Sequence, residues 1–265
     1  MSGGQGDQAA GRFRAWAAAI LAHHRRGPGQ PGAVYQTSTM AALLDGIYDG
    51  DVTIAELLTH GDFGLGTFNH LDGEMVVLDG TCYRLRADGS ATVASGQDKT
   101  PFAAVLWFRP DTTVSVTSPV GRDALTGFID GAIPSPNLTY ALRVSGSFAR
   151  VRTRTVMAQR PPYPPLTEAA AHQQVSDLGH VAGTLAGFRT PAYEQGISVA
   201  GYHLHFLTQD RRHGGHVLDF SLDHGDVMIS TASELHLSLP RTAPFLSADL
   251  SPADTDTQIK QAEDD

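Results

Sequence analysis

The chain is poor in cysteine: Cys82 is the only one among its 265 residues. A single thiol excludes an internal disulfide framework and a zinc site built from several cysteines. A metal ion in this protein would have to be bound by nitrogen and oxygen ligands. This directs attention to histidine, aspartate and glutamate.

Positive charge is also scarce, with 19 lysines and arginines against 28 acidic residues and a formal net charge of -9. Such a chain repels a phosphate backbone, so we expect no nucleic-acid partner. The apolar run from Ala15 to Ala22 is too short to span a bilayer, and no small-residue cleavage site follows it. We therefore expect a cytoplasmic protein with no membrane partner.

Proline and glycine divide the chain. Residues 1–30 form an N-terminal extension, with a helix expected from Gln8 to His24. The proline-rich segment 159–165 cannot contribute regular ladder hydrogen bonds, so it is expected to link two layers or subdomains. We divide the rest into a β-rich subdomain, 31–160, and a C-terminal subdomain, 161–265. No internal repeat is visible.

Hydroxyl side chains at the start of helical patterns predict three helices. The first covers residues 37–44, where Thr-Ser-Thr supplies the cap. The second covers 53–58, with Thr53 as its cap. The third is alanine-rich, is capped by Thr167 and runs to about Leu185.

From Phe63 the hydrophobic pattern changes to a period of two. The Asp-Gly pairs at 79–80 and 88–89 predict tight hairpins in a meander that reaches Val93. Further strands are expected at residues 103–108, 113–116, 138–144, 197–207, 217–222 and 234–239. These elements predict an α+β fold, with mixed or antiparallel sheets in two layers or subdomains and a few covering helices.

Histidines are concentrated in the stretch GYHLHFLTQDRRHGGHVLDF, residues 201–220, which holds four of the twelve in the chain. Alternate side chains of a strand share one face, so His203 and His205 are expected to point the same way. Leu204 and Phe206 would then pack on the other face. Two imidazoles therefore converge.

A hairpin adds the third imidazole. If Thr208 pairs with His213, the register places His216 opposite His205 on the same face, while His213 points to the other side. Three neutral imidazoles form a standard ligand set for catalytic zinc, which keeps a further position open for water or substrate. The sequence thus predicts a metal site.

Two alternatives stay open for this cluster. An isolated histidine is usually a surface residue or a hydrogen-bonded core residue. H-x-H also begins the metal motif of cupin-like oxygenases and sensors, although a glutamate should follow it and Asp210 in the turn stands there instead. A cupin-like metal-binding protein that uses the same histidines is therefore the alternative function.

Three segments, residues 61–80, 152–166 and 201–220, closely resemble the α-acetolactate decarboxylases. The resemblance extends from Val34 to the C-terminus. It implies a two-layer α/β protein, a possible homodimer, that uses zinc to convert (S)-2-acetolactate into (R)-acetoin and carbon dioxide. The family's metal ligands correspond to His203, His205 and His216.

The resemblance also implies roles for residues outside the histidine cluster. Arg154 and Glu74 match the active-site arginine and first glutamate of the family, and Thr67 matches a substrate-binding threonine. A second active-site glutamate lies near the family's C-terminus, where Glu263 is the nearest match. By composition alone the acidic residues 254–265 are expected to form a frayed end.

The chemistry fits these residue types. Loss of carbon dioxide from acetolactate leaves negative charge that spreads into the neighbouring ketone oxygen, and a Lewis acid at that oxygen lowers the barrier. A planar guanidinium at Arg154 can orient the departing carboxylate. The proton donor is Arg154 or a water held by Arg154 and Glu74. Glu74 and Glu263 can accept hydrogen bonds from the substrate hydroxyl or reach the metal.

Overall fold

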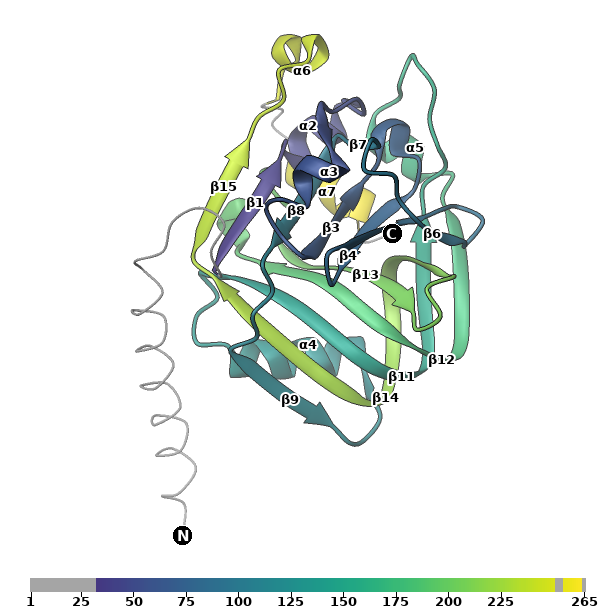
Figure 1. Cartoon of the computed structure of the whole chain (residues 1–265), viewed down its shortest axis with the longest axis vertical. Coiled ribbons are helices and arrows are strands. Elements are labelled where there is room, and N and C mark those ends of the chain that lie inside the picture. Colours follow the sequence, from purple (N-terminus) through teal and green to yellow (C-terminus); the bar gives the residue numbers. More distant parts are fainter. Residues whose placement is uncertain (1–31, 251–254, 264–265) are drawn as a thin grey trace.

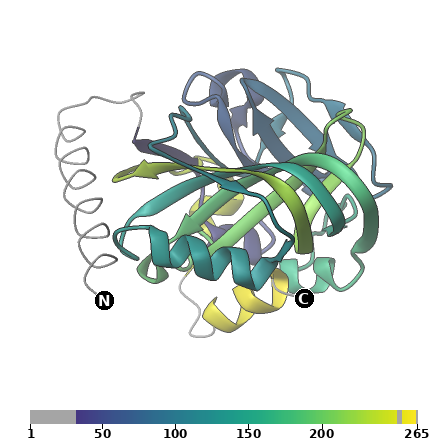
Figure 2. The same cartoon turned by 90° about the horizontal axis from the view of Figure 1, so that it is seen from below.

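The computed structural model describes residues 32–250 and 255–263 (Figures 1 and 2). The predicted N-terminal extension, including the helix Gln8 to His24, lies outside the described residues. Within them strands predominate and helices are short, so the fold is α+β with mixed sheets, as predicted. Among the described helices, none is long and apolar enough to cross a membrane.

The larger sheet has seven strands in the order β15-β1-β8-β3-β4-β5-β6. They are β1 (Ala33–Thr37), β3 (Phe63–Thr67), β4 (Glu74–Leu78), β5 (Thr81–Leu85), β6 (Ala91–Val93), β8 (Phe102–Leu106) and β15 (Glu234–Ser238). β15 runs parallel to β1, and the other neighbouring pairs are antiparallel. The late strand β15 thus pairs with the first strand of the sheet.

Both predicted Asp-Gly turns are confirmed. Leu78 pairs with Thr81, so Asp79 and Gly80 alone connect β4 to β5. Their φ angles are 51° and 76°, the two positive values that a type I′ turn requires. The pair 88–89 also lies in a hairpin, between β5 and β6, but its loop is longer: the Arg86 N–H donates to the Ser90 carbonyl at 2.8 Å, and of the two residues only Gly89 has a positive φ, 81°.

The second sheet has six strands, β9 (Thr112–Val116), β10 (Val120–Gly121), β11 (Thr139–Thr155), β12 (Gln174–Thr190), β13 (Gly201–Thr208) and β14 (Gly214–Ala232). Its order is β10-β14-β11-β12-β13, with β9 also paired to β14. Because β13 pairs with β14 as well as with β12, the four strands β11 to β14 form a closed ring. A small sheet pairs β2 (Val52–Thr53) with β7 (Lys99–Thr100).

Both large sheets draw strands from each side of the proline-rich segment 159–165, since β15 joins the first sheet while β9, β10 and β11 join the second. The subdomain boundary between residues 160 and 161 stays a prediction. The strand predicted at 138–144 is longer than expected and extends to Thr155.

The predicted helix at residues 167–185 is wrong. Its only helical part is α5 (Leu166–Ala170), which follows Pro165 as N-cap, and the chain then forms β12. Glycine supplies the physical reason. A Cβ on Gly183 would lie 2.4 Å from the Phe206 ring, and one on Gly187 would lie 2.0 Å from the His203 carbonyl oxygen. These glycines let β13 approach closely, whereas each would cost about 1 kcal/mol inside a helix.

The other helices and helical turns are α2 (Met40–Leu44), α3 (Ile54–Leu57), η1 (Asn69–Leu71), α4 (Arg122–Ala132), η2 (Ala192–Glu194), α6 (Ala243–Ser247) and α7 (Thr255–Glu263). The predicted caps of the first two are confirmed: Thr39 Oγ1 accepts from the Ala42 N–H, and Thr53 Oγ1 from the Glu56 N–H, both at 3.2 Å. Each cap stabilises its helix by about 1 kcal/mol. Helix α4, which lies along the long strands, was not predicted (Figure 2).

The core follows the alternation of β4. Met75 and Val77 belong to the cluster under α3, with Ile54 and Leu57, whereas Val76 belongs to a cluster that the two large sheets share. Burial of one such side chain stabilises the fold by about 1.5–3 kcal/mol. A third cluster joins α2, α5 and α7. Several residues of this helical cluster line the candidate site described below.

Candidate metal centre

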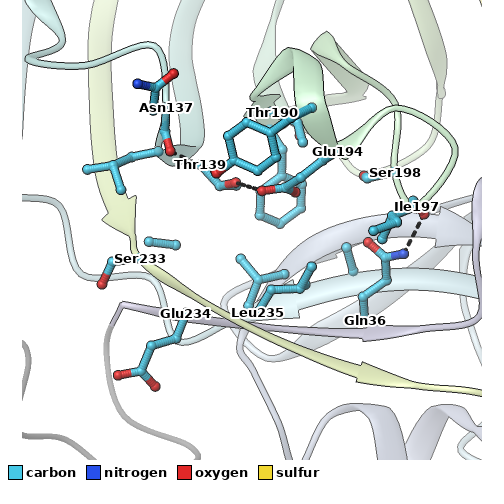
Figure 3. A pocket seen from close by; sticks show the side chains of 16 residues that line it. Gln36, Asn137, Thr139, Thr190, Glu194, Ile197, Ser198, Ser233, Glu234 and Leu235 are labelled. Carbon is cyan, nitrogen blue, oxygen red and sulfur yellow. Dashed lines mark hydrogen bonds between the residues drawn. The ribbon is translucent and has the colours of Figure 1, made fainter.

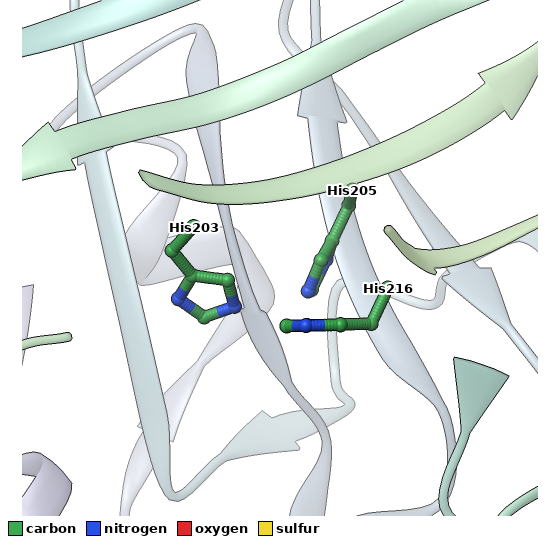
Figure 4. A group of neighbouring side chains, drawn as sticks. All are labelled: His203, His205 and His216. Atoms are coloured by element: carbon green, nitrogen blue, oxygen red, sulfur yellow. The ribbon is translucent and has the colours of Figure 1, made fainter. Parts of the chain in front are cut away.

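The three predicted imidazoles meet (Figure 4). His203 and His205 lie two residues apart on β13, and His216 on β14 is the register partner of His205. The predicted register is confirmed, because the Thr208 N–H donates to the His213 carbonyl at 2.9 Å. One ligand nitrogen from each ring of the trio lies within 4.8 Å of the others. The three side chains therefore form a group that could hold a metal ion.

His213 is not part of this group. Its side chain is exposed, and its Nδ1 lies 3.2 Å from the carbonyl oxygen of Gly89. His213 thus lies apart from the trio, in agreement with its predicted position on the opposite side of the hairpin.

The ring of His205 is oriented so that its Nε2 can bind a metal ion. Its Nδ1 lies 2.7 Å from the Met75 carbonyl oxygen, which can only accept, so Nδ1 carries the proton. The lone pair of the neutral ring is then on Nε2, which is buried and has no hydrogen-bond partner among the described residues. A buried nitrogen of this kind is costly unless it is bound. Metal-ligating histidines are commonly held in this way, with the second nitrogen on a carbonyl.

Burial keeps two of the imidazoles neutral. It is the largest cause that lowers the pKa of His205 to about 4; the Arg154 charge adds to it, and the hydrogen bond with Met75 opposes it. The pKa of His203 also lies well below its ordinary value, because of burial first and then of His205 and Arg154. Neutral imidazole is the form that binds a metal ion.

A cavity of about 40 Å³ adjoins the trio, and three further predicted residues line it together with His203 and His216. Thr67 and Glu74 face each other on β3 and β4, and Arg154 on β11 is the register partner of His216. The Thr67 hydroxyl donates to the Gly73 carbonyl at 2.9 Å. A Glu74 carboxylate oxygen lies 3.6 Å from His205 Nε2. The structure thus gathers a carboxylate, a hydroxyl and a guanidinium beside the imidazoles.

Arg154 is 3% exposed and is held from two other segments. Its Nη1 donates to Gln173 Oε1 at 2.8 Å, and its Nη2 donates to the Ala262 carbonyl at 2.5 Å. Ala262 also lines the cavity, so α7 covers one side of it. Glu263 is the next and last residue of α7. Its role stays a prediction.

The sequence did not reveal Gln173 or the carbonyl of Met75 as parts of the site. Gln173 follows α5 in the segment wrongly predicted as helix, and a main-chain carbonyl leaves no mark on the sequence. The frayed end expected from composition is also incorrect for the described part of the tail, because Ile259 and Ala262 of α7 are 1% and 2% exposed. These two apolar residues are the signal that α7 packs against the protein.

A second and larger cavity, of about 290 Å³, lies between β1, β15 and the turn η2 (Figure 3). Glu194 provides a carboxylate there and accepts from the Thr139 hydroxyl at 3.3 Å. The Gln36 amide donates to the Ile197 carbonyl at 2.7 Å. No histidine, arginine or lysine is among the described residues that line this cavity.

The fold and the site together define a β-rich protein whose three buried histidines can bind a metal ion next to an arginine and a glutamate. Comparisons with known proteins identify its relatives. The family model for alpha-acetolactate decarboxylase matches residues 34–252. The chain belongs to the alpha-acetolactate decarboxylase family, and it is a decarboxylase, an enzyme of the lyase class.

Individual relatives agree over most of the chain. The alpha-acetolactate decarboxylase of Klebsiella aerogenes is 49% identical over 230 residues, which cover 87% of this chain and 88% of the relative. That of Methylococcus capsulatus is 47% identical, with the same coverage of the two chains. The crystal structure of alpha-acetolactate decarboxylase from Bacillus subtilis strain 168 superposes with a TM-score of 0.86 at 45% identity, covering 87% of this chain and 99% of that one.

Proposed function

We propose that the protein converts (S)-2-acetolactate into (R)-acetoin and carbon dioxide with zinc bound to His203, His205 and His216. The observation that carries this proposal is the cavity in which Arg154 and Glu74 lie beside the histidines. Membership of the decarboxylase family supports the same reaction and does not favour the cupin-like alternative.

The residues present fit a zinc ion. All three donors are imidazole nitrogens, His205 presents a buried Nε2 lone pair, and the one cysteine, Cys82, is buried in another cluster. Imidazole suits zinc, and a three-histidine set leaves a position for substrate or water. When bound, the ion supplies Lewis-acid chemistry at the substrate oxygens.

Arg154 recognises the carboxylate of acetolactate and holds it so that the bond to be broken lies out of the plane of the adjacent ketone. When this carbon–carbon bond breaks, its electron pair passes into the ketone and carbon dioxide leaves. The carbon that carried the carboxylate then takes a proton, from Arg154 itself or from a water that Arg154 and Glu74 hold. Because the cavity presents that donor from one side, a single enantiomer of acetoin is expected.

The remaining polar groups bind the substrate. Glu74 accepts a hydrogen bond from the tertiary hydroxyl of the substrate, which is the only donor that the substrate has. Thr67, whose hydroxyl proton is given to the Gly73 carbonyl, lines the cavity beside Glu74 and contacts the substrate there. Glu263 completes the set from the end of α7. We propose that each of these three residues contributes to substrate binding or to the proton transfer.

We also propose that the protein is a homodimer. Among the described residues β15 is an edge strand of the larger sheet, and Leu235 and Leu237 on it are each 38% exposed. Exposed apolar side chains on an unpaired edge favour association with a second chain. Light scattering coupled to gel filtration distinguishes a dimer from a monomer. The cytoplasmic location stays a prediction, as does the absence of nucleic-acid and membrane partners.

The reaction is tested by incubating zinc-loaded protein with racemic acetolactate, followed by chiral chromatography of the acetoin. The expected result is one equivalent of (R)-acetoin for each (S)-acetolactate consumed, and loss of activity after zinc is removed by a chelator. A folded, zinc-loaded sample that forms no acetoin would contradict the proposal.

A further inference from the structure

Two acceptors of the Arg154 guanidinium come from different parts of the chain. One is the side-chain carbonyl of Gln173, a residue between α5 and β12; its oxygen lies 2.8 Å from Nη1 of Arg154. The other is the main-chain carbonyl of Ala262 in α7, whose oxygen lies 2.5 Å from Nη2 of Arg154. Both acceptors are neutral oxygens.

Two such contacts determine how a planar group lies. The N–H bonds of a guanidinium are fixed in one plane, so acceptors on two different nitrogens leave it little freedom to rotate. Neither of these two acceptors carries a charge, so these contacts orient Arg154 without neutralising it. A carboxylate in the place of Gln173 would instead compete with a substrate carboxylate for the same guanidinium.

We propose that Gln173 and the carbonyl of Ala262 are positioning groups, which set the plane of the Arg154 guanidinium for the decarboxylation. This inference rests on the proposed function. It gives α7 a role in the reaction that is carried by its main chain and is separate from the side chain of Glu263.

Packing explains how α7 places its carbonyl. Ile259 and Ala262 are buried in one cluster with Met40 of α2 and Leu166 of α5. Both α2 and α5 lie on the rim of the same cavity, since Met40 and Leu166 line it. The carbonyl of Ala262 is therefore held against Arg154 by apolar contacts, and loosening of α7 removes this acceptor.

The first test replaces the side-chain acceptor. Gln173→Met keeps the length of the side chain but removes the oxygen, and we expect kcat to fall roughly ten- to hundredfold, because small misplacements of a catalytic group have effects of this size. The enantiomeric excess of acetoin should fall with it, whereas zinc content and Tm should stay unchanged. Gln174→Met is the matched control, since Gln174 is the exposed neighbour on β12 and should behave like wild type.

Gln173→Glu separates position from charge. It keeps an acceptor in the same place, so the enantiomeric excess should be retained, while KM should rise because the new carboxylate competes with that of the substrate. A Gln173→Met enzyme with wild-type kcat and enantiomeric excess would overturn the role of Gln173.

The role of Ala262 is tested by deleting residues 262–265 and comparing the result with Glu263→Ala in the full chain. We expect the deletion to lower kcat and enantiomeric excess further than Glu263→Ala does, because only the deletion removes the carbonyl. Equal losses in the two variants would mean that the tail acts through Glu263 alone and would overturn this part of the inference.

A readout that needs no activity separates this inference from the proposed function. Two-dimensional ¹⁵N NMR of the arginine side chains reports how fast the guanidinium protons of Arg154 exchange with water. Slow exchange in wild type and faster exchange in Gln173→Met support the positioning contact even if wild type forms no acetoin, in which case the proposed function alone fails. Equal exchange in both proteins overturns the contact.

Discussion

The two cavities differ in a way that size does not predict. The one between β1, β15 and η2 encloses about 290 Å³, whereas the one at the histidines encloses about 40 Å³. The larger is lined by apolar groups, neutral polar groups and two glutamates, Glu194 and Glu234. The smaller combines imidazoles, a guanidinium and a carboxylate within contact distance. Convergent groups of different chemistry, rather than volume, identify the site.

Burial acts on both cavities with opposite results. It lowers the pKa of His205 and raises that of Glu194, because the charged form is disfavoured in each case. In the larger cavity the hydrogen bond from Thr139 opposes the shift. No histidine, arginine or lysine is among the described residues that line the cavity of Glu194, whereas a neutral His205 can be a metal ligand beside two further imidazoles. Burial therefore has a functional consequence only where the buried group is to bind a partner such as a metal ion.

The largest effect is expected from His205→Ala. Removal of one of three ligands should abolish stoichiometric zinc binding. Acetoin formation should fall by about 10³-fold or more, which exceeds the loss of about 10- to 100-fold that is typical when a residue hydrogen-bonded to a metal ligand is replaced. Elemental analysis and the acetoin assay measure the two. His213→Ala is the control within the same hairpin and should retain both; equal loss of zinc in the two variants would refute the assignment of the trio.

Arg154→Lys should have the next largest effect. Lysine keeps the positive charge but lacks the planar fork, so we expect kcat to fall roughly 10²-fold while zinc content stays at the wild-type level. Steady-state kinetics of acetoin formation check this. Arg143→Lys, on the same strand but paired with the exposed Asp79, serves as the control. Wild-type turnover by the Arg154 variant would remove this residue from the mechanism.

Acidification should destabilise the zinc-free protein, because the folded state disfavours protonation of the buried His205. The pKa of His205 is about 4 in the folded chain, whereas an unfolded histidine titrates near ~6.5. Between these values the unfolded chain binds more protons, so the free energy of unfolding falls as the pH drops, and His205 accounts for a loss on the order of 3 kcal/mol. Urea unfolding at pH 7, 5 and 4 measures it, and His205→Gln should make the dependence shallower, while His203, whose pKa is also lowered, still contributes. An unchanged slope in that variant would show that other groups cause it.

The smallest effect is expected in the larger cavity. The pKa of Glu194 is raised by burial, so the folded state disfavours the charged carboxylate, and this penalty is present at pH 7 and absent in acid. Glu194→Gln should therefore raise Tm at neutral pH by roughly 1–2 °C and leave acetoin formation within about twofold of wild type. Calorimetry at pH 7 and pH 4 checks the first part. A large loss of activity would mean that the two cavities are coupled.

Local rules predicted the parts of the fold that depend on neighbouring residues. The caps Thr39 and Thr53 and the turn at Asp79 follow from short-range hydrogen bonding and φ preferences, and all three are confirmed. The convergence of the histidines was also predictable, because strand parity and one hairpin register determine it. Their approach needed no knowledge of distant residues.

Contacts between distant segments were beyond these rules. β12 was predicted as a helix because alanines suggest one, although its pairing with both β11 and β13 outweighs that propensity. Gly183 and Gly187 were the overlooked signal. Gln173 meets Arg154 only after α5 ends early, and α7 meets it across 108 positions of sequence. No periodicity records contacts of this kind.

The hairpin between β13 and β14 makes loop length a property of the metal site. Thr208 pairs with His213, and this register alone sets His216 opposite His205. One residue inserted into or deleted from the loop would turn His216 to the other face of its strand while the hairpin itself could still form. Natural variants of this loop are therefore expected to differ freely in residue type but to conserve the parity of its length. The insertion or deletion of one loop residue should therefore impair metal binding more than any substitution at the exposed residues within the loop.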